Sequence, residues 1–180
     1  MEMKRKWPNF LVTGTPATGK STLCDRIRKS CPQFTAINIG DFAKQHQLYD
    51  GYDEEFECHV IDEESLIDKL RPTLENKNGA IVIDYHGCDL FPSEWFNAVF
   101  VLRTSNTLLY DRLLQRNYSE KKLKNNVECE IFQTILDEAN EAFDSDAVFE
   151  LQNDTEQDLE KNVEFIVDWL KKWPHSNHSS

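Results

Sequence analysis

The fold of this chain can be inferred from Gly14-Thr15-Pro16-Ala17-Thr18-Gly19-Lys20-Ser21-Thr22, which matches the pattern G-x-x-x-x-G-K-[ST]. The apolar run 9–13 before it is typical of a buried parallel strand, and Leu23 and Ile27 after it have helical spacing. A strand, a loop and a helix in this order bring backbone N–H groups and a helix N-terminus to one point. The segment therefore predicts a binding site for phosphate oxygens.

The last three residues of this segment have separate expected roles within the loop. We expect Lys20 to place a positive charge on the β and γ phosphates of a nucleoside triphosphate, and the hydroxyl of Ser21 to bind Mg²⁺. Thr22, one residue further into the helix, is expected to reach the α phosphate. The pattern thus predicts a site for a nucleoside triphosphate with Mg²⁺, but it does not indicate what happens to the γ phosphate.

The composition favours one intracellular domain. A chain of 180 residues is long enough for one domain with a substantial core and too short for two ordinary ones. No apolar run approaches the roughly 18 residues that a membrane-spanning helix needs. Residues 1–6 are basic and lead directly into Trp7 and the first strand, so we expect no signal peptide.

Cysteine content and net charge limit the kinds of partner. The five cysteines are scattered and form no C-x-x-C pair, so we expect reduced thiols, with a zinc site at Cys58, His59, His86 and Cys88 as the alternative. A net charge of −12 argues against a broad nucleic-acid-binding surface. It is compatible with a basic protein partner.

Strand-like and helical segments alternate along the chain. The apolar runs typical of strands are 9–13, 34–39, 79–84, 95–102 and 147–151. Helical spacing occupies 19–30, 41–48 with Asp41 as the N-cap, 62–77 with a kink at Pro72, 104–114, one long helix over 127–143, and 155–173. This order predicts an α/β fold of the P-loop NTPase kind, with a five-stranded parallel sheet and helices on both faces. We expect a single domain over 1–173 and a frayed end at 174–180.

Charge is distributed unevenly between two segments. Acidic residues crowd the segment from Asp41 to Asp68, which Tyr49, Tyr52 and Phe56 interrupt, so it is either a solvated face, a docking surface or a wall on which a base stacks. Between residues 103 and 124 basic residues dominate. Arg112 and Arg116 lie four residues apart on one helix face, where they either aim at the same phosphates or pair with acidic neighbours.

One carboxylate has a position that indicates function. Asp84 ends the fully apolar run 79–84. A strand of this kind places Asp84 at the carboxyl edge of the sheet, which is where open α/β sheets bind ligands.

With these segments identified, the chain resembles the adenylate kinase isoenzyme 6 family, small nuclear nucleoside monophosphate kinases linked to maturation of the small ribosomal subunit. The matching runs are Gly14 to Thr22, Asn38-Ile39-Gly40-Asp41, residues 47–55, Ile83-Asp84-Tyr85-His86-Gly87-Cys88-Asp89, residues 100–104, and Arg116-x-Tyr118-x-Glu120-Lys121-Lys122-Leu123. They cover most of residues 9 to 172.

The resemblance implies a role for each matching region. Residues 38–61 would form the monophosphate-binding region and residues 115–125 a short mobile lid. Arg116 matches the lid arginine that contacts ATP, with Arg112 as its companion; together with Lys20 they would act on the transferring group. The resemblance assigns acceptor binding to Asn38, Gly40, Asp41, Lys44, Tyr49, Asp84 and His86.

Asp84 and His86 carry the catalytic part of the resemblance. Asp84 matches the carboxylate that organises Mg²⁺ together with Ser21. His86 matches a histidine that replaces the usual residue of other kinases, and a histidine of near-neutral pKa can orient or deprotonate an attacking water. The alternative is that His86 only makes a structural hydrogen bond near the strand end.

Two residues depart from the family pattern. Ala17 stands where the family usually has glycine, and this is harmless only if the backbone there has a negative φ. Lys44 stands where an arginine is expected for the acceptor phosphate; lysine keeps the charge but lacks the two-pronged geometry.

The sequence thus predicts phosphoryl transfer from ATP–Mg²⁺ to AMP or another nucleoside monophosphate, with ATP hydrolysis as a second activity. The first alternative is an ATP-switched factor in ribosome assembly that docks a basic small-subunit ribosomal protein and whose kinase activity is incidental. The second is a metabolite kinase of the same fold, which the acidic run from Tyr49 to Glu57 disfavours. We expect a monomer that resides in the nucleus and the cytoplasm.

Overall fold

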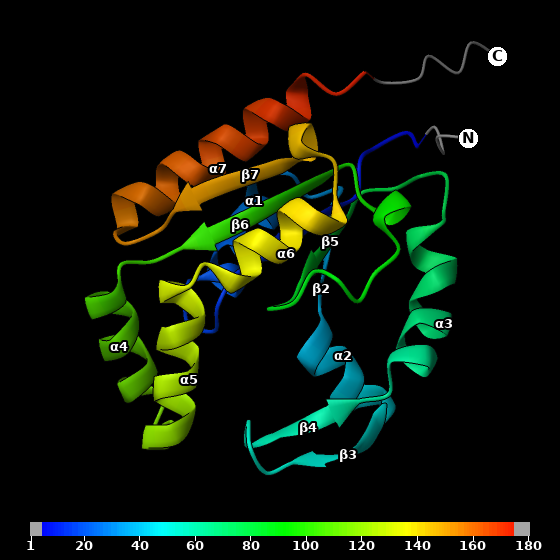
Figure 1. Ribbon diagram of the computed structural model, residues 1–180. Coiled ribbons are helices and arrows are strands. Elements are labelled where there is room, and N and C mark those ends of the chain that lie inside the picture. The colour runs from blue at the N-terminus through cyan, green and yellow to red at the C-terminus, as the bar shows by residue number, and fades with distance from the viewer. Residues whose placement is uncertain (1–4, 175–180) are drawn as a thin grey trace, which may run out of the picture.

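The computed structural model describes residues 5–174 and contains a five-stranded sheet with the strand order β2-β5-β1-β6-β7 (Figure 1). Its strands are β1 (Phe10–Thr13), β2 (Thr35–Asn38), β5 (Ile81–Asp84), β6 (Ala98–Arg103) and β7 (Val148–Gln152). Each neighbouring pair is parallel. The predicted five-stranded parallel sheet is confirmed, and its carboxyl ends share one edge.

Helices cover both faces of this sheet, as predicted. They are α1 (Lys20–Ser30), α2 (Ile39–His46), α3 (Glu63–Leu74), α4 (Asn106–Gln115), α5 (Glu120–Ile131), α6 (Thr134–Ala142) and α7 (Glu156–Lys171). Two 3₁₀ turns cover Ser93–Trp95 and Ser145–Ala147. Figure 1 shows α6 in front of the sheet and α1 behind it.

Alternate residues of β1 point into two separate cores. Leu11 belongs to a buried cluster with residues of α3 and α6, such as Leu70 and Ile135. Phe10 and Val12 belong to a second cluster that contains residues of α1 and α7. Since successive strand residues face opposite sides and both sides are covered, the central strands are apolar throughout.

The long helix predicted over 127–143 is wrong, because the chain breaks there into α5 and α6. Gln133 adopts a left-handed conformation with φ of 57° between the two helices. The two halves pack differently: Leu123 of α5 packs against α4, whereas Leu136 of α6 packs against the sheet. Glutamine is an ordinary helix former, so its sequence gives no signal for this break.

The acidic segment forms a structure that the sequence did not predict. Two strands, β3 (Tyr49–Asp53) and β4 (Cys58–Ile61), pair as an antiparallel hairpin that is separate from the main sheet. The assignment of Asp41 as N-cap is also wrong. Asn38 caps α2 by accepting a hydrogen bond from the Asp41 backbone N–H, which lies 3.0 Å from Asn38 Oδ1.

Other expectations differ in detail. The predicted helix 62–77 ends at Leu74 and runs through Pro72. Nearly all of the tail expected to fray, 174–180, lies outside the described residues. Within residues 5–174, every helix is too short or too polar to cross a lipid bilayer.

Candidate active site

The loop between β1 and α1 requires glycine at both ends. Gly14 and Gly19 have φ of 140° and 98°. A Cβ on Gly14 would lie 2.5 Å from the carbonyl oxygen of Leu102, and a Cβ on Gly19 would lie 2.5 Å from Nδ2 of Asn153. Both the backbone conformation and the close neighbours therefore exclude a side chain at these positions.

Ala17 occupies a strained position within the loop. Its φ is 71°, so the condition under which alanine would be harmless here is not met. Its carbonyl accepts a hydrogen bond from Nη1 of Arg112 at 3.3 Å, and the residue is buried. The left-handed conformation is thus held in place by contacts outside the loop.

Lys20 lies under the loop, with its ammonium enclosed by the protein although part of the residue is exposed. Its Nζ donates to the carbonyls of Gly14 at 2.7 Å and Thr15 at 3.0 Å. Burial lowers the pKa of Lys20, Asp84 raises it and Arg116 lowers it, and together these influences bring the pKa to about 8. Incoming phosphates would therefore have to replace these two carbonyls, and near pH 8 they would meet a lysine that is only partly charged.

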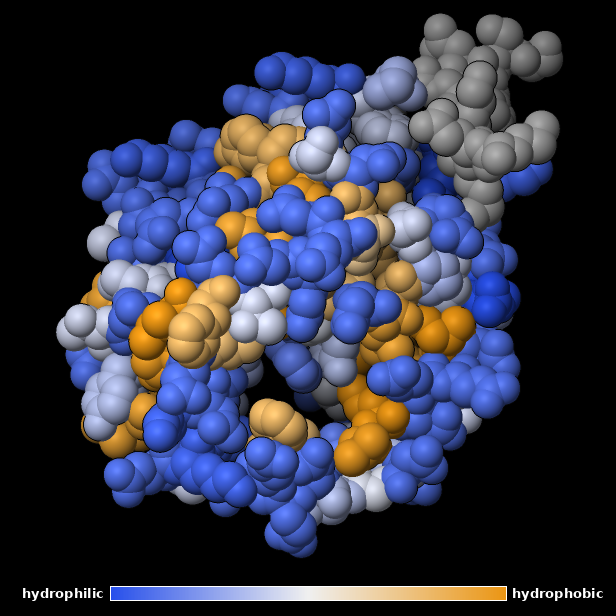
Figure 2. All heavy atoms as spheres, in the orientation of Figure 1, coloured by the Kyte–Doolittle hydropathy of each residue, from blue (hydrophilic) through white to orange (hydrophobic). Residues whose placement is uncertain are grey.

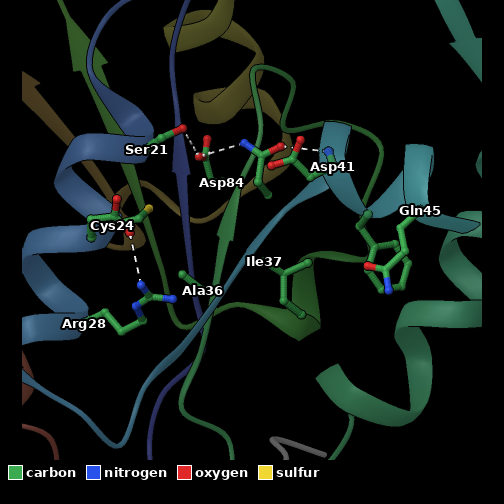
Figure 3. A pocket seen from close by; sticks show the side chains of 11 residues that line it. Ser21, Cys24, Arg28, Ala36, Ile37, Asp41, Gln45 and Asp84 are labelled. Carbon is green, nitrogen blue, oxygen red and sulfur yellow. Dashed lines mark hydrogen bonds and ion pairs between the residues drawn. The ribbon is translucent and has the colours of Figure 1, made fainter.

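Ser21, Asp84 and Asn38 form one hydrogen-bonded group at the carboxyl edge of the sheet. Figure 3 shows Ser21 and Asp84 joined in this group. Asp84, 3% exposed, accepts from Ser21 Oγ at 2.5 Å and from Asn38 Nδ2 at 2.9 Å, both at Oδ2. Among residues 5–174 there is no cluster of three or more His, Cys, Asp or Glu side chains suited to a metal. One hydroxyl and one carboxylate fit Mg²⁺, which usually takes its other ligands from water and phosphate.

A central hollow of about 510 Å³ adjoins the loop, a volume within the range of small-ligand sites. Of the predicted site residues, it is lined by Pro16, Ala17, Gly19, Lys20, Ser21, Thr22, Asn38, Gly40, Tyr49, Asp84, His86 and Arg116. The space-filling view shows an opening between α5 and the β3–β4 hairpin (Figure 2). The structure thus brings most of the predicted site together around one space.

The hairpin contributes an aromatic wall to this hollow, made of Tyr49, Tyr52 and His59. The His59 ring stacks on Tyr49 with 4.7 Å between centroids and meets Tyr52 edge-on at 5.4 Å. Sequence reasoning named Tyr49 as an acceptor residue but named His59 only as a ligand of the alternative zinc site, because it did not foresee the hairpin that aligns the two rings. The alternation of tyrosines with acidic residues was the available signal.

Across the hollow, the 115–125 segment touches the hairpin. Ser119 Oγ donates to the carboxylate of Glu57, and Lys122 Nζ donates to the Glu57 carbonyl at 3.1 Å. The Lys122 ammonium also lies 4.7 Å from the centre of the Tyr118 ring. Two segments far apart in sequence therefore meet over the site.

A second hollow of about 500 Å³ lies on the other side of the loop, between α4 and the start of α7. Arg116 lines both hollows. Arg112 is held differently: its guanidinium donates to the carbonyls of Ala17, Asn153 and Asp154. Neither arginine takes part in an ion pair within the described chain, and direct contact of Arg112 with phosphate stays a prediction.

His86 follows β5 and faces the central hollow. Although the side chain is exposed, nearby protein removes much of its hydration; this desolvation, together with the charge of Lys20, lowers the pKa of the imidazole to about 4. His86 is therefore neutral at pH 7, but its pKa lies below the near-neutral value expected from the sequence, so the ring accepts a hydrogen bond more readily than a proton.

Two predicted acceptor residues lie elsewhere. Asp41 lines a groove of about 450 Å³ between α1 and α2, which reaches Ser21 and Asp84 at one end (Figure 3). Lys44 is exposed on α2 and is absent from the lining of all three hollows. Its contact with an acceptor phosphate stays a prediction.

The fold and the loop define the chain as a P-loop NTPase. A family model described as an AAA domain matches residues 11–133. Shikimate kinase from Bacteroides thetaiotaomicron has a similar fold, with a TM-score of 0.54 over 91% of this chain and 98% of that one. At 16% identity this likeness concerns the fold alone.

Full-length relatives narrow the class to one family. The chain is 47% identical to an adenylate kinase isoenzyme 6 homolog of Drosophila melanogaster, over 92% of this chain and 93% of the relative. It is 48% identical to the homolog of Caenorhabditis elegans, over 91% and 90% of the two chains. The chain belongs to the adenylate kinase isoenzyme 6 family, as its motifs had indicated, and is a nucleotide kinase-like P-loop protein.

The strain at Ala17 can be measured. We predict that Ala17→Gly raises the free energy of unfolding by about 0.5–1 kcal/mol, because glycine relieves a left-handed alanine and this gain exceeds its extra unfolded-state entropy. Urea denaturation measures the change. As control, Ala36→Gly in β2 should lower stability; a loss of stability in Ala17→Gly as well would show that the loop is unstrained.

We predict that Lys20 takes up a proton when MgATP binds. Since phosphate binding favours charged Lys20, and its pKa is about 8 in the free protein, MgATP binding at pH 8 should take up about half a proton. Uptake should vanish toward pH 6, where Lys20 is already charged. Calorimetry in two buffers of different ionisation enthalpy measures it, and Lys20→Arg, which is always charged, should show none. Equal heats in both buffers at pH 8 for the native protein would contradict the prediction.

Proposed function

We propose that this protein transfers the γ-phosphoryl group of ATP to AMP or to another nucleoside monophosphate. The observation that carries the proposal is that the phosphate loop, Asp84 and the aromatic wall line one hollow. Donor phosphates and an acceptor base would thus have places around the same space. The names of the relatives, adenylate kinase isoenzyme 6 homologs, support this assignment.

The hairpin is proposed as the acceptor site, within a monophosphate-binding region of residues 38–61. Tyr49, Tyr52 and His59 offer ring faces on which a nucleobase can stack, and such stacking tolerates different bases. Lys122, which lines the same hollow, supplies positive charge near the acceptor. In this proposal, the positive charge of Lys122 would take the place of that of Lys44, which is exposed on α2.

Phosphoryl transfer requires that the negative charge of the transferring group be stabilised and that water be excluded from the site. An oxygen of the acceptor phosphate attacks the γ phosphorus, the bond from that phosphorus to the β–γ bridging oxygen breaks, and two nucleoside diphosphates result. Lys20 and Arg116 would balance the charge of the transferring group. Bound Mg²⁺, held through Ser21 and Asp84, would neutralise β and γ oxygens. Residues 115–125 would act as the lid, closing over the hollow by their contacts with Glu57.

ATP hydrolysis is proposed as the second activity. When no acceptor fills the hollow, water can take its place. A neutral His86 beside Lys20 and Asp84 would accept a hydrogen bond from that water and so orient it. The same site would then release ADP and phosphate.

A second candidate function is that of an ATP-switched factor in maturation of the small ribosomal subunit, present in nucleus and cytoplasm. The net charge of −12 and the exposed carboxylates of Asp50, Glu54 and Glu55 on the hairpin favour a basic protein partner. A ribosomal protein bound there would sit beside the acceptor hollow and so affect ATP turnover. We propose a monomer with a single domain over residues 1–173 for either function.

Product analysis separates the two functions. We predict that AMP accelerates ATP consumption with two ADP formed per ATP consumed, and that Lys20→Ala abolishes both activities because charge stabilisation in the transition state is lost. Parallel reactions contain ATP alone, ATP with CMP, GMP or UMP, and ATP with small-subunit ribosomal proteins at low and high salt. Stimulation by the ribosomal proteins alone, weakened by salt, would favour the assembly factor. No stimulation by any monophosphate would rule out the kinase.

The role of His86 can be separated from that of the aromatic wall. We expect His86→Ala to lower ATP hydrolysis about 100-fold, because water loses the hydrogen-bond acceptor that orients it, and to affect AMP phosphorylation much less. His59→Ala serves as the contrast and should raise the KM for AMP while sparing hydrolysis. Steady-state rates with and without AMP measure both. Equal losses of the two activities in His86→Ala would remove the water-orienting role.

A further inference from the structure

Glu130 is a buried carboxylate that none of the predicted roles includes. It lies at the end of α5 and is 2% exposed. Its Oε2 accepts from the Thr15 hydroxyl at 2.6 Å, and its Oε1 accepts from Arg103 Nε at 2.7 Å and from the Thr104 backbone N–H at 3.1 Å. Both oxygens are therefore committed to donors, as a buried charge requires.

Arg103 joins α5 to the sheet at this point. It is the last residue of β6, and its Nη2 donates to the Glu130 backbone carbonyl at 3.1 Å. Its Nη1 donates to the exposed carboxylate of Glu150 at 3.0 Å. The end of α5, the carboxyl end of β6 and the phosphate loop thus meet at Glu130.

Thr15 connects Glu130 to the lysine of the loop. The Thr15 side chain is completely buried and bonds to Glu130, while its carbonyl accepts from Lys20 Nζ at 3.0 Å and from Thr18 Oγ1 at 2.8 Å. Holding the Thr15 side chain consequently fixes the backbone of the phosphate loop, including the carbonyl that binds the Lys20 ammonium when no nucleotide is present. The negative charge of Glu130 also raises the pKa of Lys20, as the smallest of the named influences.

The other end of α5 reaches the hairpin. Lys122, in the first turn of α5, donates to the Glu57 carbonyl. A helix of 12 residues is about 18 Å long, so α5 spans the side of the hollow from the hairpin contact to the loop. Glu130 anchors the inner end of this helix to the loop.

We propose that Glu130 is a positioning residue of the nucleotide site, which fixes the phosphate loop through Thr15 and ties it to the base of α5. The inference deepens the proposed function in that it assumes ATP binds at this loop. The competing explanation is that Glu130 only neutralises Arg103 in the core. In that case its loss would reduce stability without a specific effect on ATP affinity.

Removal of the Thr15 hydroxyl tests the link directly. We expect Thr15→Val, which keeps the shape of the side chain, to raise the dissociation constant of MgATP about tenfold, since a hydrogen bond to a charged group is lost. Thr15→Ser, which keeps the hydroxyl, should restore affinity. Calorimetry with a non-hydrolysable ATP analogue measures the constants, and thermal melting without nucleotide reports stability. Equal affinities of the valine and serine variants would overturn the proposal. This comparison needs no substitution at Glu130, so it remains decisive even if the Glu130 variants fail to fold.

A double-mutant cycle identifies the partner. Glu130→Gln alone should weaken binding about tenfold, and Thr15→Val with Glu130→Gln should also weaken it about tenfold, because both changes remove one interaction. An approximately hundredfold loss in the double variant would overturn the proposal.

Glu150→Gln, which removes the exposed partner of Arg103, is the matched control and should leave the affinity for MgATP unchanged. An equal loss of affinity in this variant would assign the effect to the pairing of Arg103 instead. The affinity for the ATP analogue is measured without an acceptor, so this test does not depend on kinase activity. If the protein lacked kinase activity, the proposed function would be refuted, but the role of Glu130 in ATP binding could still be tested.

Discussion

The enclosed ammonium of Lys20 is the feature on which the other parts of the site depend. A lysine there needs hydrogen-bond acceptors when no phosphate is present, and the carbonyls of Gly14 and Thr15 provide them. The loop can offer these carbonyls only in a tight conformation with positive φ at Gly14 and Gly19. The two glycines permit the loop conformation, and that conformation presents the carbonyls that the charged Lys20 requires.

The parallel sheet explains why distant residues reach this loop. β5 and β6 flank β1, so Asp84 and Arg103 end beside it at the same edge. Arg112 and Asn153 then support the loop from outside by bonding to the carbonyls of Ala17 and Thr18. The strain at Ala17 persists because several such contacts determine its position.

Much of the fold could be predicted because it rests on periodic signals. Apolar strands buried on both faces, and helices with a single apolar stripe, leave a clear pattern over many residues. The phosphate loop and Asp84 were found because each stands at the end of such a strand. The resemblance to the family rested on short runs of residues, and the full-length relatives confirmed it.

The remainder depends on interactions that sequence spacing does not encode. The break at Gln133 is not marked by a glycine or a proline. In the hairpin, β3 contains two aspartates and a glycine and no β-branched side chain, so its pairing with Val60 and Ile61 of β4 leaves no regular strand pattern. Glu130 appears in sequence as one glutamate among many acidic residues. Only the tertiary arrangement places it against Thr15, 115 positions away.

A crystal structure with a bound MgATP analogue tests the central role of Lys20 most directly. We predict that its Nζ leaves the carbonyls of Gly14 and Thr15 for the β and γ phosphates, and that the bond between Ser21 and Asp84 opens around the metal. A structure in which Lys20 still binds the two carbonyls while the analogue lies elsewhere would contradict this view of the site.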